Sequence, residues 1–246
     1  MTNDLVLCSI EGGLARITLN RPEKLNAISL AAFREIDAHL DQITPDTVGC
    51  VLLDAAGRSF CAGHDLDDIA GGSEDGAAGR FETGVIERLA TLPMPVVAAV
   101  QGHCMTGGLE LVLAADIIIA GEGAKFADTH AKWDLVPIWG LSQRLPRRIG
   151  AARADEMMYA SRTYSGAQAA AMGLANLCVP DDDLATEAAR MCADILANSW
   201  RATRAMKALR SQTDGMTLTG GVAWEMHHSA GRGPEMAGRL ARMRKK

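Results

Sequence analysis

A strand, a glycine-rich turn, a helix and a second strand follow one another in the middle of the chain. Val96–Val100 is an unbroken apolar run of strand length, residues 101–108 hold the turn, residues 109–115 form a short apolar helix, and residues 116–120 return to a strand. Chains in which strands and helices alternate pack helices against a sheet. This order predicts an α/β domain and limits the fold class more than any other feature of the sequence.

The first sixty residues fit the same class. Residues 5–9 and Leu14–Leu19 are apolar and β-branched, and the turn at residues 11–13 (Glu-Gly-Gly) predicts a hairpin. Residues 48–54 predict a further strand. Ser29 is the expected N-cap of an amphipathic helix, because apolar residues follow at helical spacing: Leu30, Phe33, Ile36 and Leu40.

Glycine and proline mark the next boundaries. Residues 71–79 are rich in glycine and lack periodicity, so they predict a loop. Residues 80–92 predict a helix, which Pro93 and Pro95 stop.

The last third of the sequence predicts a mainly helical region, most clearly at residues 184–198. A Pro-Asp-Asp-Asp segment at residues 180–183 precedes it and is the expected hinge. The predicted division is a core over residues 1–183 and a C-terminal helical region over residues 184–246.

Composition excludes several classes of function. The 246 residues are 48% hydrophobic and 22% charged, which is ordinary for a soluble globular enzyme. The net charge is −5 and basic residues are scattered, so nucleic acid is not an expected ligand. The longest apolar runs, residues 95–100 and 109–120, are too short to cross a membrane. Six cysteines without a C-x-x-C pair, and no signal segment, predict a cytoplasmic protein with reduced thiols and no metal.

Two glycine-rich segments share one design. Residues 60–65 (Phe-Cys-Ala-Gly-His-Asp) and residues 102–108 (Gly-His-Cys-Met-Thr-Gly-Gly) each follow a strand and open a helix. Small residues allow a tight turn and leave backbone N–H groups at a helix N-terminus, where negative charge is stabilised. Each segment alone is more often a plain strand-to-helix connection. Two together predict an oxyanion hole, in which one donor is worth ~3 kcal/mol in the transition state.

These segments, with others in the same order, resemble the crotonase superfamily, the enoyl-CoA hydratase/isomerase family. The resemblance runs collinearly over about residues 5–210, and the last thirty-odd residues match poorly. The matching segments are residues 19–27 (Leu-Asn-Arg-Pro-Glu-Lys-Leu-Asn-Ala), 60–66, 95–102, 107–111 and 115–117, followed by 124–126, 144–146, Gly150 and 170–174.

The resemblance implies stacked β-β-α turns in a superhelix like that of the Clp-type protease, with C-terminal helices that drive trimers, often paired into hexamers. It implies an acyl-CoA thioester whose carbonyl oxygen is held by the backbone N–H groups of His64 and Gly107. Coenzyme A would lie against the backbone around Leu25, Ala62 and Asp65. Neither a metal nor a separate cofactor is implied, because the hole itself stabilises the enolate.

The acid–base residues depart from the family's pattern. Family hydratases use two glutamates, and the resemblance places Glu110 at the first position. The second position, four residues after the Ala-Lys-Phe motif, holds His130, which can exchange protons near neutral pH. Asp134 would orient His130 if the segment is helical. Each residue also has a non-catalytic interpretation. Glu110 would then serve only as a favourable negative charge at a helix N-terminus, and His130 as a polar loop residue.

Three more side chains have two possible roles each. Trp133 and Trp139 either line an acyl pocket or pack in the core. The His64 side chain either points into the cleft or serves only through its backbone; its Ala-Gly-His-Asp segment resembles that of some decarboxylating members.

The sequence thus predicts an enoyl-CoA hydratase/isomerase-like enzyme that works through an oxyanion-hole-stabilised enolate. The enzymatic alternatives are decarboxylation, double-bond isomerisation and carbon–carbon hydrolysis, each of which needs a single acid or base. An alternative of another class is a non-catalytic scaffold that binds acyl-CoA. A serine nucleophile is disfavoured, because the chain has no G-x-S-x-G motif.

Overall fold

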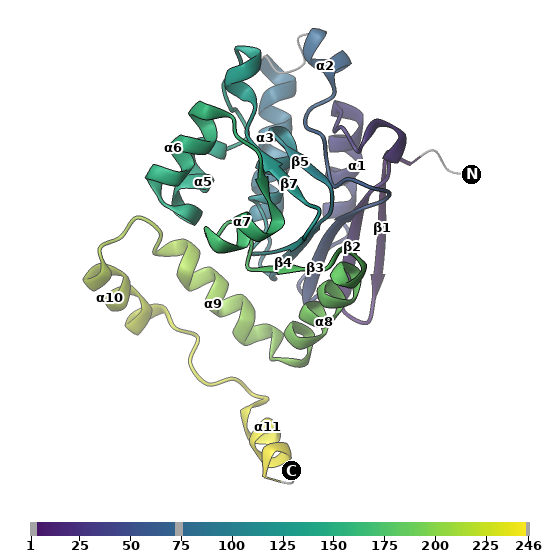
Figure 1. Cartoon of the computed structure of the whole chain (residues 1–246). Coiled ribbons are helices and arrows are strands. Elements are labelled where there is room, and N and C mark those ends of the chain that lie inside the picture. The colour runs from purple at the N-terminus through teal and green to yellow at the C-terminus, as the bar shows by residue number, and fades with distance from the viewer. Residues whose placement is uncertain (1–3, 72–75, 245–246) are drawn as a thin grey trace.

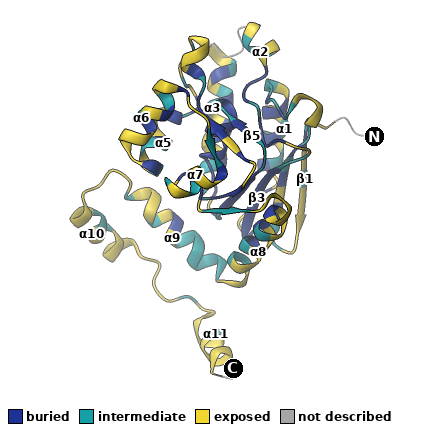
Figure 2. Cartoon of the chain, viewed as in Figure 1, coloured by how far each residue is buried: buried dark blue, intermediate teal, exposed yellow. Residues whose placement is uncertain are grey.

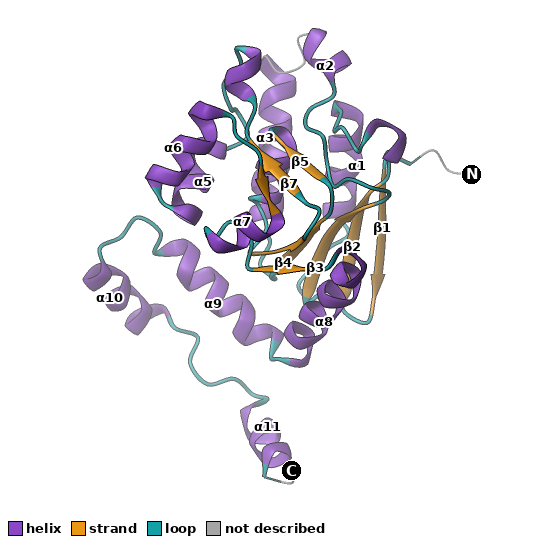
Figure 3. Cartoon of the chain, in the orientation of Figure 1, coloured by secondary structure: helices purple, strands orange, loops and turns teal. Residues whose placement is uncertain are grey.

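A six-stranded sheet forms the centre of the computed structural model, which describes residues 4–71 and 76–244 (Figures 1 and 3). The first two strands form an antiparallel hairpin, and the others add in parallel. The strands lie in the order β1 (Val6–Glu11), β2 (Leu14–Leu19), β3 (Cys50–Ala55), β4 (Val96–Val100), β6 (Ile117–Gly121) and β9 (Leu177–Val179). A smaller sheet joins β5 (His103–Met105), β7 (Lys125–Ala127) and β8 (Tyr164–Ser165).

Helices cover both faces of the large sheet. Successive side chains of a strand point to opposite faces, so apolar residues of one strand pack against both helical layers. On one face, Leu53 and Ala98 belong to the main core with residues of α1 (Leu30–Leu40) and α3 (Gly76–Ala90). On the other face, Leu52 packs with apolar residues of α8 (Leu184–Ala197). Figure 2 shows these strands buried between the two layers. The predicted α/β class is therefore confirmed.

Other helices and 3₁₀ turns connect these strands or follow the last of them. In order they are η1 (Pro22–Lys24), α2 (Leu66–Ala70), α4 (Gly107–Val112), η2 (His130–Trp133), α5 (Leu141–Ile149), α6 (Ala151–Ala160), α7 (Gly166–Ala171), η3 (Asp181–Asp183), α9 (Trp200–Gln212), α10 (Leu218–His228) and α11 (Met236–Met243).

Local sequence signals placed several elements correctly. The predicted hairpin forms, and Gly12 and Gly13 make its turn with φ values of 57° and 87°, which favour glycine. The side chain of Ser29 caps α1 by accepting the N–H of Ala32. The predicted apolar stripe of α1 is buried against the core.

Two local predictions were wrong, and tertiary packing is the reason in each case. Residues 76–79 are helical, since α3 begins at Gly76 and buries Gly79; residues 72–75 lie outside the described residues. Residues 101–108 are not a plain turn, because His103–Met105 form β5 against β7 and the helix already begins at Gly107.

The C-terminal helices differ in how they contact the core. A partly buried ion pair joins α9 to the core: Lys207 Nζ lies 2.6 Å from Asp116 Oδ2 and donates to the Met94 carbonyl at 3.1 Å. By contrast, α10 and α11 extend away from the body of the molecule and are exposed (Figures 1 and 2). No helix within the described ranges is long and apolar enough to cross a membrane.

Candidate functional site

The two glycine-rich segments meet side by side. Cys61 and Cys104 pair as an isolated parallel bridge, and the Met105 N–H donates to the Cys61 carbonyl at 3.0 Å. A Cβ on Gly107 would lie 3.2 Å from the backbone nitrogen of His64 and 2.5 Å from Trp139 Cζ3. Only glycine fits there, and the absence of a side chain brings the backbones at residues 64 and 107 into contact.

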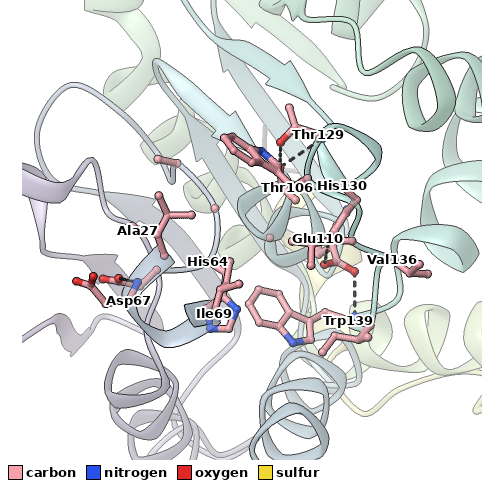
Figure 4. A pocket seen from close by; sticks show the side chains of 18 of the residues that line it. Ala27, His64, Asp67, Ile69, Thr106, Glu110, Thr129, His130, Val136 and Trp139 are labelled. Atoms are coloured by element: carbon pink, nitrogen blue, oxygen red, sulfur yellow. Dashed lines mark hydrogen bonds and ion pairs between the residues drawn. The ribbon is translucent and has the colours of Figure 1, made fainter. Parts of the chain in front are cut away.

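A cavity of about 550 Å³ opens beside this contact (Figure 4). Its volume is within the range of small-molecule sites. Loop, helix and 3₁₀ segments from the first half of the chain and from residues 129–139 line it: Lys24, Ala27, Ala62, Gly63, His64, Asp65, Leu66, Asp67, Ile69, Thr106, Gly107, Glu110, Thr129, His130, Trp133, Leu135, Val136, Ile138 and Trp139.

Glu110 stands on the first turn of α4 and reaches the cavity with 1% of its surface exposed. Its Oε1 accepts the backbone N–H groups of Trp139 at 2.9 Å and Leu141 at 3.1 Å. Burial raises the pKa of Glu110 to about 7, although these two bonds and the nearby His130 favour the carboxylate. Such a carboxyl group can hold or release a proton at neutral pH.

His130 lines the same cavity and faces Glu110. Its Nε2 lies 3.6 Å from Glu110 Oε2, so the two predicted acid–base residues are brought together. Its Nδ1 lies 2.5 Å from Oδ1 of Asp128, which also accepts the His130 backbone N–H at 3.2 Å. Because a carboxylate only accepts, Nδ1 carries the proton of this bond, and Nε2 is the ring nitrogen that faces Glu110.

The carboxylate that contacts the His130 ring is Asp128, which the sequence interpretation missed. Asp134, which was expected to orient His130, does not do so. The prediction for Asp134 assumed an α-helix, in which residues four apart share a face. The segment is instead the 3₁₀ helix η2, and Asp134 ends it, exposed, with φ at 56°. Asp128 is buried with 1% exposure at the end of β7, two residues before the histidine. The Asp-Thr-His spacing was the available signal.

Both tryptophans line the cavity, in different ways. Trp139 is 2% exposed and packs edge-on against Phe33 at 4.8 Å between ring centroids, so it belongs to the core as well. Trp133 is 65% exposed and lies at the rim. The His64 side chain also lines the cavity, with its ring 4.9 Å from that of Trp139.

Two of the predicted coenzyme A residues line the cavity. They are Ala62 and Asp65, which line it together with Lys24, whereas Leu25 is not among the lining residues. The Leu25 carbonyl accepts the Ala62 N–H at 3.0 Å, and Asp65 is ion-paired with Arg21. Among the residues described, no three His, Cys, Asp or Glu side chains are placed to hold a metal ion.

Two adjacent backbone turns thus lie beside a buried carboxyl–imidazole pair, on a sheet that helices cover on both faces. The family model described as enoyl-CoA hydratase/isomerase matches residues 9–230. The chain belongs to this enoyl-CoA hydratase/isomerase family, and the predicted superfamily and fold are confirmed.

Individual relatives agree with this assignment. The probable enoyl-CoA hydratase 1, peroxisomal, of Arabidopsis thaliana is 35% identical over 213 residues, covering 86% of this chain and 79% of its own. The crystal structure of an enoyl-CoA hydratase from Bacillus anthracis matches with a TM-score of 0.89 and 32% identity over 98% of this chain and 97% of the other. A structure from Thermobifida fusca YX in complex with CoA matches with a TM-score of 0.83 and 27% identity over 99% and 95%.

Proposed function

We propose that this enzyme adds water reversibly across the double bond of an enoyl-CoA thioester. The observation that carries the proposal is the Glu110–His130 pair, with 3.6 Å between Oε2 and Nε2 and both residues lining the cavity. Hydration needs two proton transfers, one from water and one to the α-carbon, and two adjacent acid–base groups can serve both. Decarboxylation or isomerisation would need only one of them.

In the proposed reaction, the thioester oxygen accepts the N–H groups of His64 and Gly107, which stabilise the enolate as it forms. The Nε2 lone pair of His130 takes a proton from water while the water oxygen bonds to the β-carbon. Glu110, protonated, gives its proton to the α-carbon. The imidazolium then returns a proton to the Glu110 carboxylate across 3.6 Å, so the enzyme ends as it began.

Coenzyme A is proposed to enter past Ala62 and Asp65, with its chain against the backbone near Leu25. Support comes from the similar Thermobifida fusca structure in complex with CoA and from Ala62 and Asp65, which both line the cavity. The positive charge of Lys24 is available to a phosphate there. No cofactor beyond the thioester is proposed, and six free cysteines support a cytoplasmic location.

The proposed hydration is tested with crotonyl-CoA, by following the loss of enoyl-thioester absorbance and identifying the 3-hydroxyacyl product by chromatography. We expect turnover that reaches an equilibrium mixture from either side. Enoyl thioesters of short, long and aromatic acyl groups extend the assay. If none is hydrated, while malonyl-type thioesters lose carbon dioxide or double bonds move, the proposed reaction is wrong.

The C-terminal region, residues 184–246, is proposed to hold the chains of a trimer together, alone or as half of a hexamer. Support comes from apolar side chains that α10 exposes to water, including Leu218 at 86% and Met226 at 77%. We expect sedimentation velocity to give a trimer or hexamer, and Leu218→Glu with Met226→Glu to dissociate it. Thr219→Glu, an exposed polar position on the same helix, is the control. A monomeric wild type contradicts this proposal.

A further inference from the structure

Glu82 is a buried carboxyl group that the proposed reaction does not use. It projects from α3 with 0% exposure, and neither oxygen has a hydrogen-bond partner among the residues described. Its ion-pair contact is His64, whose Nε2 lies 3.5 Å from Glu82 Oε1. A buried carboxyl group whose oxygens accept no hydrogen bond destabilises the folded state. Such a group is a candidate for a functional role.

His64 connects Glu82 to the proposed oxyanion hole. Its backbone is one of the two proposed N–H donors, and the same backbone pairs with Ile28 as a parallel bridge. Its imidazole ring contacts both Glu82, through Nε2, and the indole of Trp139, with 4.9 Å between ring centroids. Figure 4 shows the His64 and Trp139 rings next to each other at the cavity. A change in the orientation of the imidazole is therefore expected to move the backbone N–H of His64.

Trp139, which contacts His64, also contacts Gly107 and Glu110. Its Cζ3 lies 2.5 Å from where a Gly107 Cβ would be, so the indole edge rests on the second proposed donor. Its backbone N–H donates to Glu110 Oε1 at 2.9 Å. A chain of contacts thus runs from Glu82 through His64 and Trp139 to Gly107 and Glu110.

We propose that Glu82 is a positioning residue for the oxyanion hole: by holding the His64 imidazole against Trp139, it aims both backbone donors at the thioester oxygen. The inference rests on the proposed function, because it takes that hole as the site of the thioester. Rate depends steeply on such aim, and a displacement of ~1 Å can cost about 100-fold. A side chain retained only for stability would instead be replaced without loss by an apolar one of similar size.

The direct test is the carbonyl stretch of a saturated acyl-CoA, labelled with ¹³C at the thioester carbonyl and bound to the enzyme without turnover. Hydrogen bonds from the hole weaken this carbonyl, so its frequency falls on binding. In Glu82→Gln and Glu82→Leu we expect the frequency to return toward the free value. In the hydration assay we expect kcat to fall about 10- to 100-fold, with KM changed less than about 3-fold.

Two comparisons keep this test specific. Glu122→Gln, an exposed carboxylate after β6 that does not line the cavity, should change neither quantity. In His64→Ala, which keeps the N–H but removes the ring, Glu82→Gln should have no further effect, since the two act as one unit. An unchanged carbonyl frequency and kcat in Glu82→Leu would overturn the proposal. A wild type without any carbonyl shift would overturn the oxyanion hole itself.

Discussion

Glu110→Gln is expected to lower kcat for enoyl-CoA hydration by about 1,000-fold while KM changes only a few-fold. The amide oxygen can still accept the N–H groups of Trp139 and Leu141, which Oε1 of Glu110 accepts now. The variant therefore keeps the shape of the site. It has no proton to give to the α-carbon, so both proton transfers fall to His130.

The same substitution is expected to stabilise the protein at high pH. The pKa of Glu110 is raised by burial from 4.5 to about 7. The protonated form of Glu110 therefore stabilises the folded state. This contribution is fully present below pH 4.5 and is lost as pH rises through about 7. At pH 8 the buried carboxylate costs up to ~3 kcal/mol, which the neutral glutamine avoids.

Thermal unfolding at pH 5 and pH 8 checks this result beside the kinetic assay. We expect the Tm of Glu110→Gln to exceed that of the wild type at pH 8, with a much smaller difference at pH 5. Glu122→Gln, at an exposed position after β6, should change neither Tm nor kcat. More than a tenth of wild-type kcat in Glu110→Gln would exclude Glu110 as the proton donor.

The elements that could be predicted from sequence are those whose causes are local. A hairpin needs two β-branched runs and a glycine turn, and α1 needs a capping serine and an apolar stripe, so both can be read within a dozen residues. The glycine-rich segment at residues 102–108 was recognised for the same reason, but it is not the plain turn that was expected, because residues 103–105 form a strand. Strand β5, by contrast, exists because β7 pairs with it, and each pairing partner, such as Lys125 for His103, lies 22 residues further along the chain.

The site shows the same division between local and distant causes. Glu110 and His130 follow recognisable motifs, and the structure brings them together. Asp128 was missed because its role depends on the turn between β7 and η2, which puts a residue only two positions away against the imidazole. Glu82 belongs to no motif: its contact with His64 comes from α3 packing against a loop 18 residues earlier in the chain, which no local pattern reveals.

His130→Gln is expected to lower kcat about 100- to 1,000-fold, because glutamine cannot take a proton from water. The wild-type rate should fall on the acid side as Nε2 becomes protonated, and this acid limb should be absent from the variant. The full pH profile of kcat/KM measures both effects. A variant that keeps the wild-type acid limb would show that another group is the base.

Variants of Asp128 and Asp134 test which of the two carboxylates supports His130 as the base. In Asp128→Asn the amide oxygen can still accept from Nδ1, but the negative charge that stabilises the imidazolium is gone. Nε2 then holds a proton less strongly, so the acid limb should move to lower pH while the maximal rate falls ~10-fold. Asp134→Asn, at the exposed end of η2, should leave the profile unchanged. An acid limb that moves with Asp134 and not with Asp128 would reverse the assignment, and would mean that η2 rearranges when the thioester binds.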